Sequence, residues 1–541
     1  MIKISRQRKL FAIAVLSVAL GVLIRWDNMP ENTGGGGYLT VGVCDSGRLR
    51  TLLSGLEETS ERPALSFNGH GTAYDAVSDR YFVTQNMENG VWDGVLTASA
   101  GELYWQEDAC FGDCAGAIAE GHSFLLYGID RKKGTWCTYD VVFTGMPVMT
   151  IETASGAGIG DEAQNAKVQV SDMKFTGKEY QSADCQAAVR GNSSRRFPKQ
   201  SYKLELDRKM SLLGMRRDDD WILTALYDDD GLIHNKFAYD VWRAIASDNA
   251  DPKDGGTTME YVELFADNVY MGVYGLTERI DAKELSLEKN DVLYKCRGFA
   301  LPDESIPEDF GLSIDYDIKY PKTVNRATWL PIKEYLDIFA ADEIEDYDAA
   351  RTLLNMENAI DYNIFVILTR ACDNYTRKNT FFVAAYDRQT GRHVISKVPW
   401  DCNATWGDGL YKGNLDRKLY NAGWAYCAYV WSEDVKQMYR CRQDEIQELT
   451  LARWRQLRED ILSKDRLYGM LDEDFAYLHA SGAYDRNYVR WEEHGREHWQ
   501  DAYIYEYVEN RLDFLDAYFE APYFDEEPLA EEEENDVSGG R

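Results

Sequence analysis

The sequence predicts an α+β protein whose first half is rich in β-strands and whose second half is mostly helical. Short apolar runs separated by Gly, Asn and Asp fill the first half, a pattern that is typical of strands joined by turns. After about Asn325 the apolar residues recur at helical spacing, and Ser432 to Phe519 is amphipathic throughout. The 541 residues exceed the usual size of one domain, so we expect several units along the chain.

The N-terminus has the pattern of a membrane-targeting segment. Residues 1–9 are basic, and Leu10 to Ile24 carry no charge. This run is shorter than the ~20 residues that span a bilayer comfortably, and no cleavage site of small residues follows it. We therefore favour an uncleaved signal-anchor over a cleaved signal peptide or a buried helix. The basic flank places the body of the protein outside the membrane, and glycines 34–37 complete a flexible linker within residues 1–37.

Two further units and a tail are expected after the anchor. Residues 38–145 alternate short strand-like runs with turns, which predicts a small all-β accessory module without a catalytic constellation. Residues 146–522 form the main domain, in which strand pairs lie close to the boundary between the β-rich and helical parts. Residues 523–541 include an almost continuous carboxylate run, which is typical of a solvated, disordered tail.

The composition excludes several classes of protein. The chain has 92 Asp and Glu against 59 Lys and Arg, a formal net charge of −33. Because nucleic-acid binding needs a basic surface, we expect no nucleic-acid partner. An aromatic content of 13% is too high for a disordered chain. Among the 10 cysteines, Cys110 and Cys114 form the closest pair, for which we expect a disulfide or two buried thiols rather than a metal site.

One segment of this acidic chain is rich in cations. Between Arg190 and Lys203 a Gly/Ser turn exposes backbone N–H groups, which can hold an anion. Lys199 and Lys203 follow on what we expect to be one face of the next strand. This concentration of charge indicates a phosphate-facing surface, and the alternative is an ordinary hairpin with solvated Lys and Arg side chains.

Two later segments carry residues that suit a metal ion and a proton acceptor. Asp373 and Asn379 lie on a loop after the apolar helix Ile364 to Leu368. Asp373 is suited to accept a proton from a hydroxyl, and the amide oxygen of Asn379 is suited to Mg²⁺, a cation that takes oxygen ligands. Asp401 stands at the exit of the strand Val394 to Val398 and offers a carboxylate. The alternatives are the turn-forming and capping roles that are common for Asp and Asn.

The order of these segments is more informative than any one of them. A cationic strand is followed by a strand exit bearing Glu278, the loop from Asp373 to Asn379, two short strands and Asp401. Protein kinases have their parts in this order, with a strand Lys held by a Glu, an Asp that orients the hydroxyl, and an Asn and an Asp that hold metal. We therefore expect a kinase-like fold with a β-rich N-lobe and a helical C-lobe. The usual His-Arg-Asp and Asp-Phe-Gly spellings are absent, which excludes an ordinary protein kinase.

Several of these segments together resemble the spore-coat protein H (CotH) kinase family. The resemblance covers roughly Pro147 to Phe519 and leaves the N-terminal module unexplained. The matching segments are Arg190-Gly-Asn-Ser-Ser194 with Pro198-Lys199, His234 to Asp240, Leu276 to Asp281, Asp373 to Asn379, and Pro399-Trp-Asp401.

The resemblance implies an atypical, secreted or surface-associated protein kinase with two lobes. Members of that family bind ATP with Mg²⁺ (or Mn²⁺) and phosphorylate Ser on coat or extracellular proteins. The expected partners are therefore a protein with a Ser acceptor and, through the N-terminal segment, a membrane. The implied roles are catalysis for Asp373, metal binding for Asn379 and Asp401, and nucleotide binding for Arg190, Ser194, Glu278 and either Lys199 or Lys203. Glu278 is the implied partner of whichever of these lysines contacts the phosphates.

One departure from the family pattern leaves the activity open. The family usually has a second acidic residue two positions after the Trp-Asp aspartate, and here that residue is Asn403. We keep three interpretations: an extracytoplasmic MgATP-dependent Ser (or Thr) kinase, a weakly active or inactive kinase-like scaffold of surface or coat assembly, and a carbohydrate-active surface protein. The 14 Trp and 35 Tyr would suit sugar stacking, but the cationic strand and the lack of a clear carboxylate pair disfavour the last.

Overall fold

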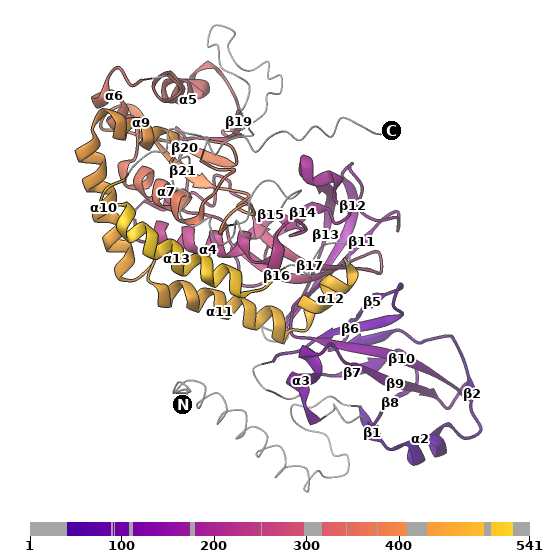
Figure 1. Cartoon of the computed structure of the whole chain (residues 1–541). Coiled ribbons are helices and arrows are strands. Elements are labelled where there is room, and N and C mark those ends of the chain that lie inside the picture. The colour runs from indigo at the N-terminus through magenta and orange to yellow at the C-terminus, as the bar shows by residue number, and fades with distance from the viewer. Residues whose placement is uncertain are drawn as a thin grey trace, which may run out of the picture.

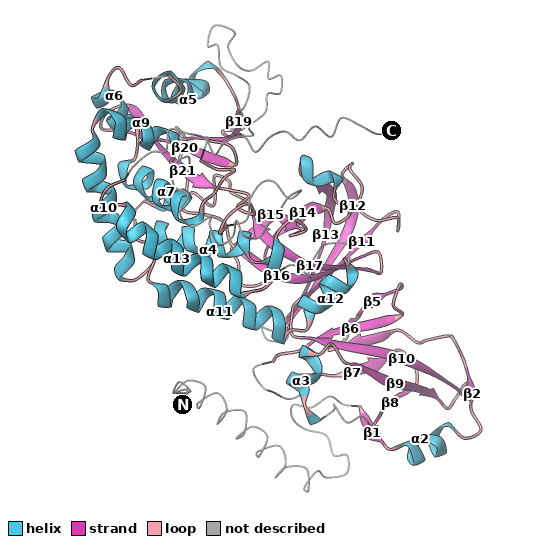
Figure 2. Ribbon diagram, viewed as in Figure 1, coloured by secondary structure: helices cyan, strands magenta, loops and turns pink. Residues whose placement is uncertain are grey.

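The computed structural model describes residues 41–522 except 88–89, 91, 108–111, 174–178, 250, 297–315, 342, 376, 408–429 and 492–498. The expected signal-anchor, the glycine linker, the acidic tail and Cys110 lie outside the described residues. Among those that are described, no helix has the length and hydropathy needed to cross a bilayer. The α+β prediction is confirmed, with strands gathered in the first half and helices in the second (Figures 1 and 2).

The strands up to Thr144 form two sheets. The elements are β1 (Gly42–Cys44), α2 (Ser46–Leu53), β2 (Glu57–Glu58), β3 (Leu65–Phe67), β4 (His70–Gly71), β5 (Ala73–Asp75), β6 (Arg80–Thr84), β7 (Leu96–Ala98), β8 (Glu102–Gln106), α3 (Cys114–Ala119), β9 (Ser123–Asp130) and β10 (Thr135–Thr144). The larger sheet has the order β1-β8-β9-β10-β6-β5, with β2 paired to β10, and the smaller has the order β4-β3-β7. Their shared core contains Trp105, Phe124 and Tyr139, which alternate with more exposed residues along β8, β9 and β10.

The next strands close into a barrel. They are β11 (Val148–Thr153), β12 (Gln164–Asp172), β13 (Glu179–Arg190), β14 (Ser201–Ser211), β15 (Arg217–Thr224), β16 (Met259–Ala266) and β17 (Val269–Glu278), with α4 (His234–Ala246) between β15 and β16. The order around the barrel is β11-β12-β13-β14-β15-β17-β16. Strands β16 and β17 form a hairpin with a turn at Asp267-Asn268, and both residues have positive φ angles, as a tight turn between right-twisted strands requires.

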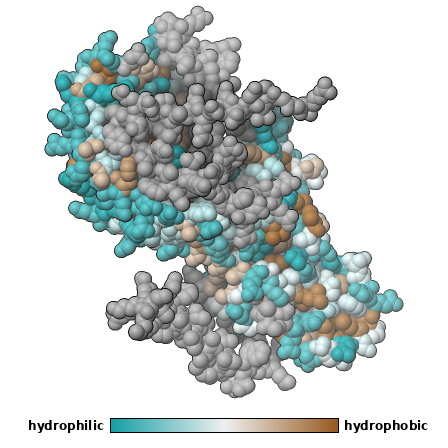
Figure 3. Space-filling model, in the orientation of Figure 1, coloured by the Kyte–Doolittle hydropathy of each residue, from teal (hydrophilic) through white to brown (hydrophobic). Residues whose placement is uncertain are grey.

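A four-stranded sheet and a set of helices make up the rest. They are β18 (Val292–Cys296), β19 (Tyr316–Tyr320), α5 (Arg326–Phe339), α6 (Tyr347–Leu353), α7 (Met356–Thr369), β20 (Thr380–Asp387), β21 (Arg392–Pro399), α9 (Glu433–Cys441), α10 (Gln443–Glu459), α11 (Lys464–Ala480), α12 (Ala483–Arg490) and α13 (Ala502–Tyr518). The sheet has the order β19-β18-β20-β21. Helix α7 is buried from Asn358 to Thr369 and lies at the centre of the helices. The outer faces of α10 and α11 are hydrophilic (Figure 3), as predicted for amphipathic helices.

A buried ion pair attaches α12 to the barrel. Glu263 of β16 is fully buried and pairs with Arg486 of α12 through two contacts of 2.9 and 2.8 Å. The hydroxyl of Tyr270 donates a third hydrogen bond to this carboxylate at 2.6 Å. Just before α12, the carbonyl of Ser481 accepts hydrogen bonds from Gly145 N–H and from the Thr144 hydroxyl. The first sheet, the barrel and the helices therefore meet at this point (Figure 1).

We expect Arg486→Ala to lower the free energy of unfolding by about 3–5 kcal/mol, because it leaves the Glu263 carboxylate buried without its cation. Urea denaturation of the folded body measures this. The control is Arg455→Ala, which breaks the exposed pair with Glu520 and should cost at most about 1 kcal/mol. Equal effects of the two substitutions would contradict the prediction.

Candidate active site

A cation-rich cavity lies between the barrel and the four-stranded sheet. It has a volume of about 330 Å³ and is lined by strands β13, β14 and β15 on one side and by β18, β19, β20 and the end of β21 on the other. In a chain with a formal net charge of −33, a wall with more cations than carboxylates favours an anionic ligand. The charged lining residues are Arg190, Lys203, Arg279, Lys295 and Lys319, with Glu205 and Asp220 as the carboxylates.

Two of these cations lie against the ring of Trp400. The Arg190 guanidinium carbon is 5.7 Å from the ring centroid, and the Lys295 Nζ is 5.3 Å from it. Lys295 also lies 5.4 Å from the ring of Phe381. Burial lowers the pKa of Arg190, and the nearby Asp401 carboxylate opposes this effect. The aromatic rings thus hold two cations at the cavity wall by cation–π attraction.

The structure separates the two candidate lysines, and the expectation that they share a strand face is wrong. Lys199 precedes β14, is only 1% exposed, and donates to the Val273 carbonyl at 2.5 Å and to Asn487 Oδ1 at 2.9 Å. Burial holds its pKa well below the usual range. Lys203 is exposed on β14, lines the cavity, and forms no hydrogen bond or ion pair with the residues that the structure describes. Of the two, only Lys203 is available to an anion in the cavity.

The partner of Glu278 also differs from the expected one. Glu278 accepts a hydrogen bond from the backbone N–H of Arg216 at 2.8 Å, and the Arg216 Nε lies 3.9 Å from the same oxygen. Within the described chain neither Lys199 nor Lys203 pairs with it. The same guanidinium pairs with Glu284 at 2.8 Å. Glu278 therefore belongs to an ion-pair network at the end of β17, because Arg216, just before β15, lies closer to it than either lysine.

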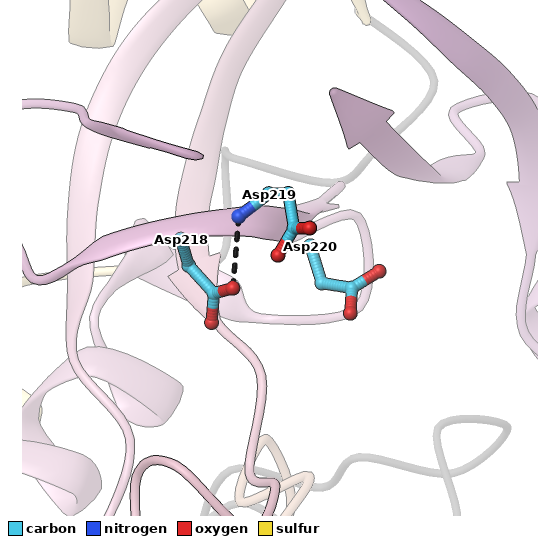
Figure 4. A group of neighbouring side chains, drawn as sticks. All are labelled: Asp218, Asp219 and Asp220. Atoms are coloured by element: carbon cyan, nitrogen blue, oxygen red, sulfur yellow. Dashed lines mark hydrogen bonds between the residues drawn. The ribbon is translucent and has the colours of Figure 1, made fainter. Parts of the chain in front are cut away.

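An acidic triplet at the start of β15 is part of that network. Asp218, Asp219 and Asp220 offer carboxylate oxygens within 4.8 Å of one another (Figure 4). Arg216 and Lys283 each pair with Asp218 at 2.5 Å, and Lys283 also reaches Asp219 at 3.1 Å. Arg279 lies 3.5 Å from Asp220, so each of the three carboxylates is paired with one of the protein's own cations.

The loop after α7 places Asp373 between two donors. Lys378 Nζ donates to both carboxylate oxygens of Asp373, at 2.5 and 2.7 Å, and Asn379 Nδ2 donates to one of them at 2.7 Å. Burial raises the pKa of Asp373, whereas Lys378 and Asn379 act in the opposite direction. Because Asn379 uses its amide nitrogen for this bond, its amide oxygen is left for a cation.

Asp401 follows the end of β21, and its carboxylate has no partner among the described residues. Its backbone N–H donates to the Tyr239 hydroxyl of α4 at 3.1 Å, and its side chain is exposed and has no hydrogen bond or ion pair within the described ranges. The charge of Asp401 contributes to the raised pKa of Asp373, so the two carboxylates lie near each other. Asp401 and Asn379 both have positive φ angles, 57° and 51°, which is strained for residues other than glycine. A carboxylate and an amide oxygen fit the ligand preferences of Mg²⁺.

The turn after β13 is built around Gly191. Its φ is +110°, and a Cβ here would lie 2.1 Å from Ser194 Oγ, so a side chain is excluded. Arg195 braces the turn through a 3.0 Å hydrogen bond to the Gly191 carbonyl. Ser194, predicted to bind nucleotide, belongs to the short 3₁₀ helix 193–196 and does not line the cavity.

Asn403, which replaces the acidic residue of the family pattern, has a partner of its own. Its Nδ2 donates to Asp228 Oδ2 at 2.9 Å. A carboxylate at position 403 would repel Asp228, so the neutral amide suits this contact.

Several residues of the cavity and of the neighbouring loops were not predicted from the sequence. Lys295 interrupts the otherwise buried strand Val-Leu-Tyr-Lys-Cys. A charge within such an apolar run indicates a functional residue, so the sequence could have identified Lys295. Arg279 and Lys319 stand at or beyond strand ends and gave no such signal. Tyr239 and Lys378 become relevant only through their contacts with Asp401 and Asp373.

Comparison with known proteins identifies a family for this chain. No curated protein matches the chain. The family model described as CotH kinase protein matches residues 187–515, which is more than half of the sequence and covers the barrel from the end of β13 onward, the cavity and the loop of Asp373. This confirms the resemblance that the sequence motifs indicated. The chain therefore belongs to the CotH kinase family.

Proposed function

We propose that this protein is an extracytoplasmic atypical protein kinase that transfers the γ-phosphate of ATP to a Ser (or Thr) hydroxyl of a surface or coat protein. Membership of a kinase-like family supports phosphoryl transfer in general. The observation that carries the proposal is the five-cation cavity, whose Trp400 wall immediately precedes Asp401. A nucleotide triphosphate is the kind of anion that such a wall favours.

In the proposed reaction Asp373 acts on the acceptor hydroxyl. The hydroxyl oxygen forms a bond to the γ-phosphorus, the bond between that phosphorus and the β–γ bridging oxygen breaks, ADP leaves, and the hydroxyl proton passes to Asp373. Arg190 and Lys203 bind the phosphates as fixed positive charges. Asn379 and Asp401 would hold Mg²⁺ or Mn²⁺, which neutralises charge on the transferred group when bound.

The positions of the barrel and of the four-stranded sheet support a fold with two lobes. The barrel supplies Arg190 and Lys203 to the cavity, and the four-stranded sheet, which packs with the helices, supplies Lys295 and Trp400. We infer that the barrel acts as the N-lobe and the helical part as the C-lobe of a kinase-like fold, with the cavity as the nucleotide site.

A kinase-like scaffold without activity is the second candidate, and Asn403 is the observation that favours it. Its amide binds Asp228 and brings no charge to a second metal ion. Thermal unfolding with and without MgATP separates the two functions, because a ligand that binds only the folded protein raises its melting temperature. An unchanged melting temperature favours the scaffold.

The first test of the kinase proposal compares two substitutions in a soluble form that lacks residues 1–37. Asp401→Asn should abolish phosphorylation and weaken Mg²⁺-dependent ATP binding, because it removes a metal ligand. Asp373→Asn should also abolish phosphorylation but leave the ATP affinity nearly unchanged, because this carboxylate faces the acceptor. Autophosphorylation with labelled MgATP and calorimetric titration measure the two effects. Wild-type phosphorylation by both variants would refute the kinase proposal.

The second test compares the two lysines. Lys203→Ala should weaken MgATP binding by about 10-fold or more, since a charge-assisted contact is worth about 1.5–3 kcal/mol. Lys199→Met should lower the melting temperature and leave the affinity within about 2-fold of the wild type, because Lys199 is buried away from the cavity. An affinity that depends on Lys199 instead would show that the cavity is not the nucleotide site.

The third test concerns the location of the protein. We propose that the N-terminal segment anchors it to the cell membrane, with the catalytic body outside. The native protein should then fractionate with membranes, and deletion of residues 1–30 should release it. Recovery of the full-length protein in the soluble cytoplasmic fraction would contradict the proposed location while leaving the kinase chemistry untouched.

A further inference from the structure

A buried asparagine links the backbone of Asn379 to that of the residue before Asp401. Asn374 is 1% exposed and follows Asp373 in the loop. Its Nδ2 donates to the carbonyl of Asn379 at 3.1 Å and to the carbonyl of Trp400 at 2.8 Å. Trp400 immediately precedes Asp401. One amide group therefore holds the backbone at both positions that carry the proposed metal ligands.

The orientation of this amide is fixed by its partners. Both partners are carbonyl oxygens, so only the nitrogen can face them. The Asn374 Oδ1 is consequently buried, and within the described chain no donor reaches it. A buried acceptor without a donor destabilises the fold. The contribution of this side chain therefore lies in its nitrogen, which satisfies the Asn379 and Trp400 carbonyls together.

The surrounding contacts make this amide part of a rigid frame. The Tyr362 hydroxyl of α7 lies 3.2 Å from the Asn374 carbonyl and 2.7 Å from the Thr380 hydroxyl. The Trp400 N–H donates to the Asn379 carbonyl at 2.9 Å. Helix α7, the loop and the open end of the β20–β21 hairpin are thus held together around Asn374.

We propose that Asn374 is a positioning residue that sets the separation of Asn379 and Asp401 and thereby the affinity of the site for its divalent cation. This inference rests on the proposed function, in which those two residues hold Mg²⁺ or Mn²⁺. Asn374 itself does not touch the metal or the nucleotide. It acts through the backbone of its neighbours, as partners that orient metal ligands do.

The test is a Mg²⁺ titration of ATP binding by the wild type and two variants of the soluble body. In Asn374→Ala we expect the half-saturating Mg²⁺ concentration to rise by about 10-fold or more. The control is Asn358→Ala, since Asn358 is also buried and clamps Lys397 of β21 through two hydrogen bonds of 3.0 and 2.6 Å. That variant should lose stability without Mg²⁺ but keep the wild-type Mg²⁺ requirement.

A second substitution protects the test against loss of folding. Asn374→Ser keeps one donor, so it should shift the half-saturating Mg²⁺ concentration in the same direction by a smaller factor. Melting temperatures measured without metal establish that each variant is folded.

Three outcomes overturn the inference. If the wild type binds MgATP and both Asn374 variants need the same Mg²⁺ concentration within about 2-fold, the positioning role alone is refuted. If Asn358→Ala shifts the Mg²⁺ requirement as much as Asn374→Ala does, the effect is general destabilisation. If the wild type itself shows no Mg²⁺-dependent nucleotide binding, the proposed function fails together with the inference.

Discussion

The main physical constraint on this protein is to keep one cavity positive in a strongly negative chain. The structure meets it by pairing carboxylates with cations elsewhere. At the end of the barrel, the Arg216 guanidinium forms ion pairs with Asp218, Glu278, Asp281 and Glu284. In the cavity wall Arg279 pairs with Asp220 at 3.5 Å and Lys319 pairs with Asp317 at 2.8 Å, whereas Lys203 has no partner among the described residues. Because buried or shielded pairs project little field, the cavity is governed by its own lining. The proposed recognition of phosphate therefore depends on where the carboxylates are neutralised.

The part of the site that the sequence predicts best is the part fixed by local geometry. Strands β20 and β21 form an antiparallel hairpin in which Thr380 pairs with Pro399. Such a hairpin brings its two ends together, so the residues just outside it, Asn379 and Trp400, must be neighbours. The sequence order of loop, two short strands and Asp401 already implied this. The alternation of β14, with Leu204 inside the barrel and Lys203 outside, followed equally from period two.

The predictions from sequence were wrong where a residue far away along the chain determines the environment of a side chain. Lys199 stands before β14, so strand alternation does not reach it, and its partner Asn487 is 288 residues away. Likewise Glu278 meets Arg216, which is 62 residues earlier on the chain. Charge and spacing along the sequence do not show which of these residues will pair, because closure of the barrel and packing of α12 determine the contacts. The family pattern identified the segments correctly, yet the choice between two nearby lysines needed the tertiary structure.

Asn379 links the proposed base to the proposed metal site through one side chain. An Asp that accepts a proton has to be ionised first, and burial works against this by raising the pKa of Asp373. Lys378 and the Asn379 amide nitrogen oppose that rise by donating hydrogen bonds to the carboxylate. The same bond turns the Asn379 oxygen away from Asp373 and leaves it for a cation. In the proposed mechanism one planar amide therefore tunes the base with its nitrogen and would bind the metal with its oxygen. The carbonyl of this residue is held by two donors, Asn374 Nδ2 and Trp400 N–H, and any shift of its backbone would disturb both proposed tasks at once.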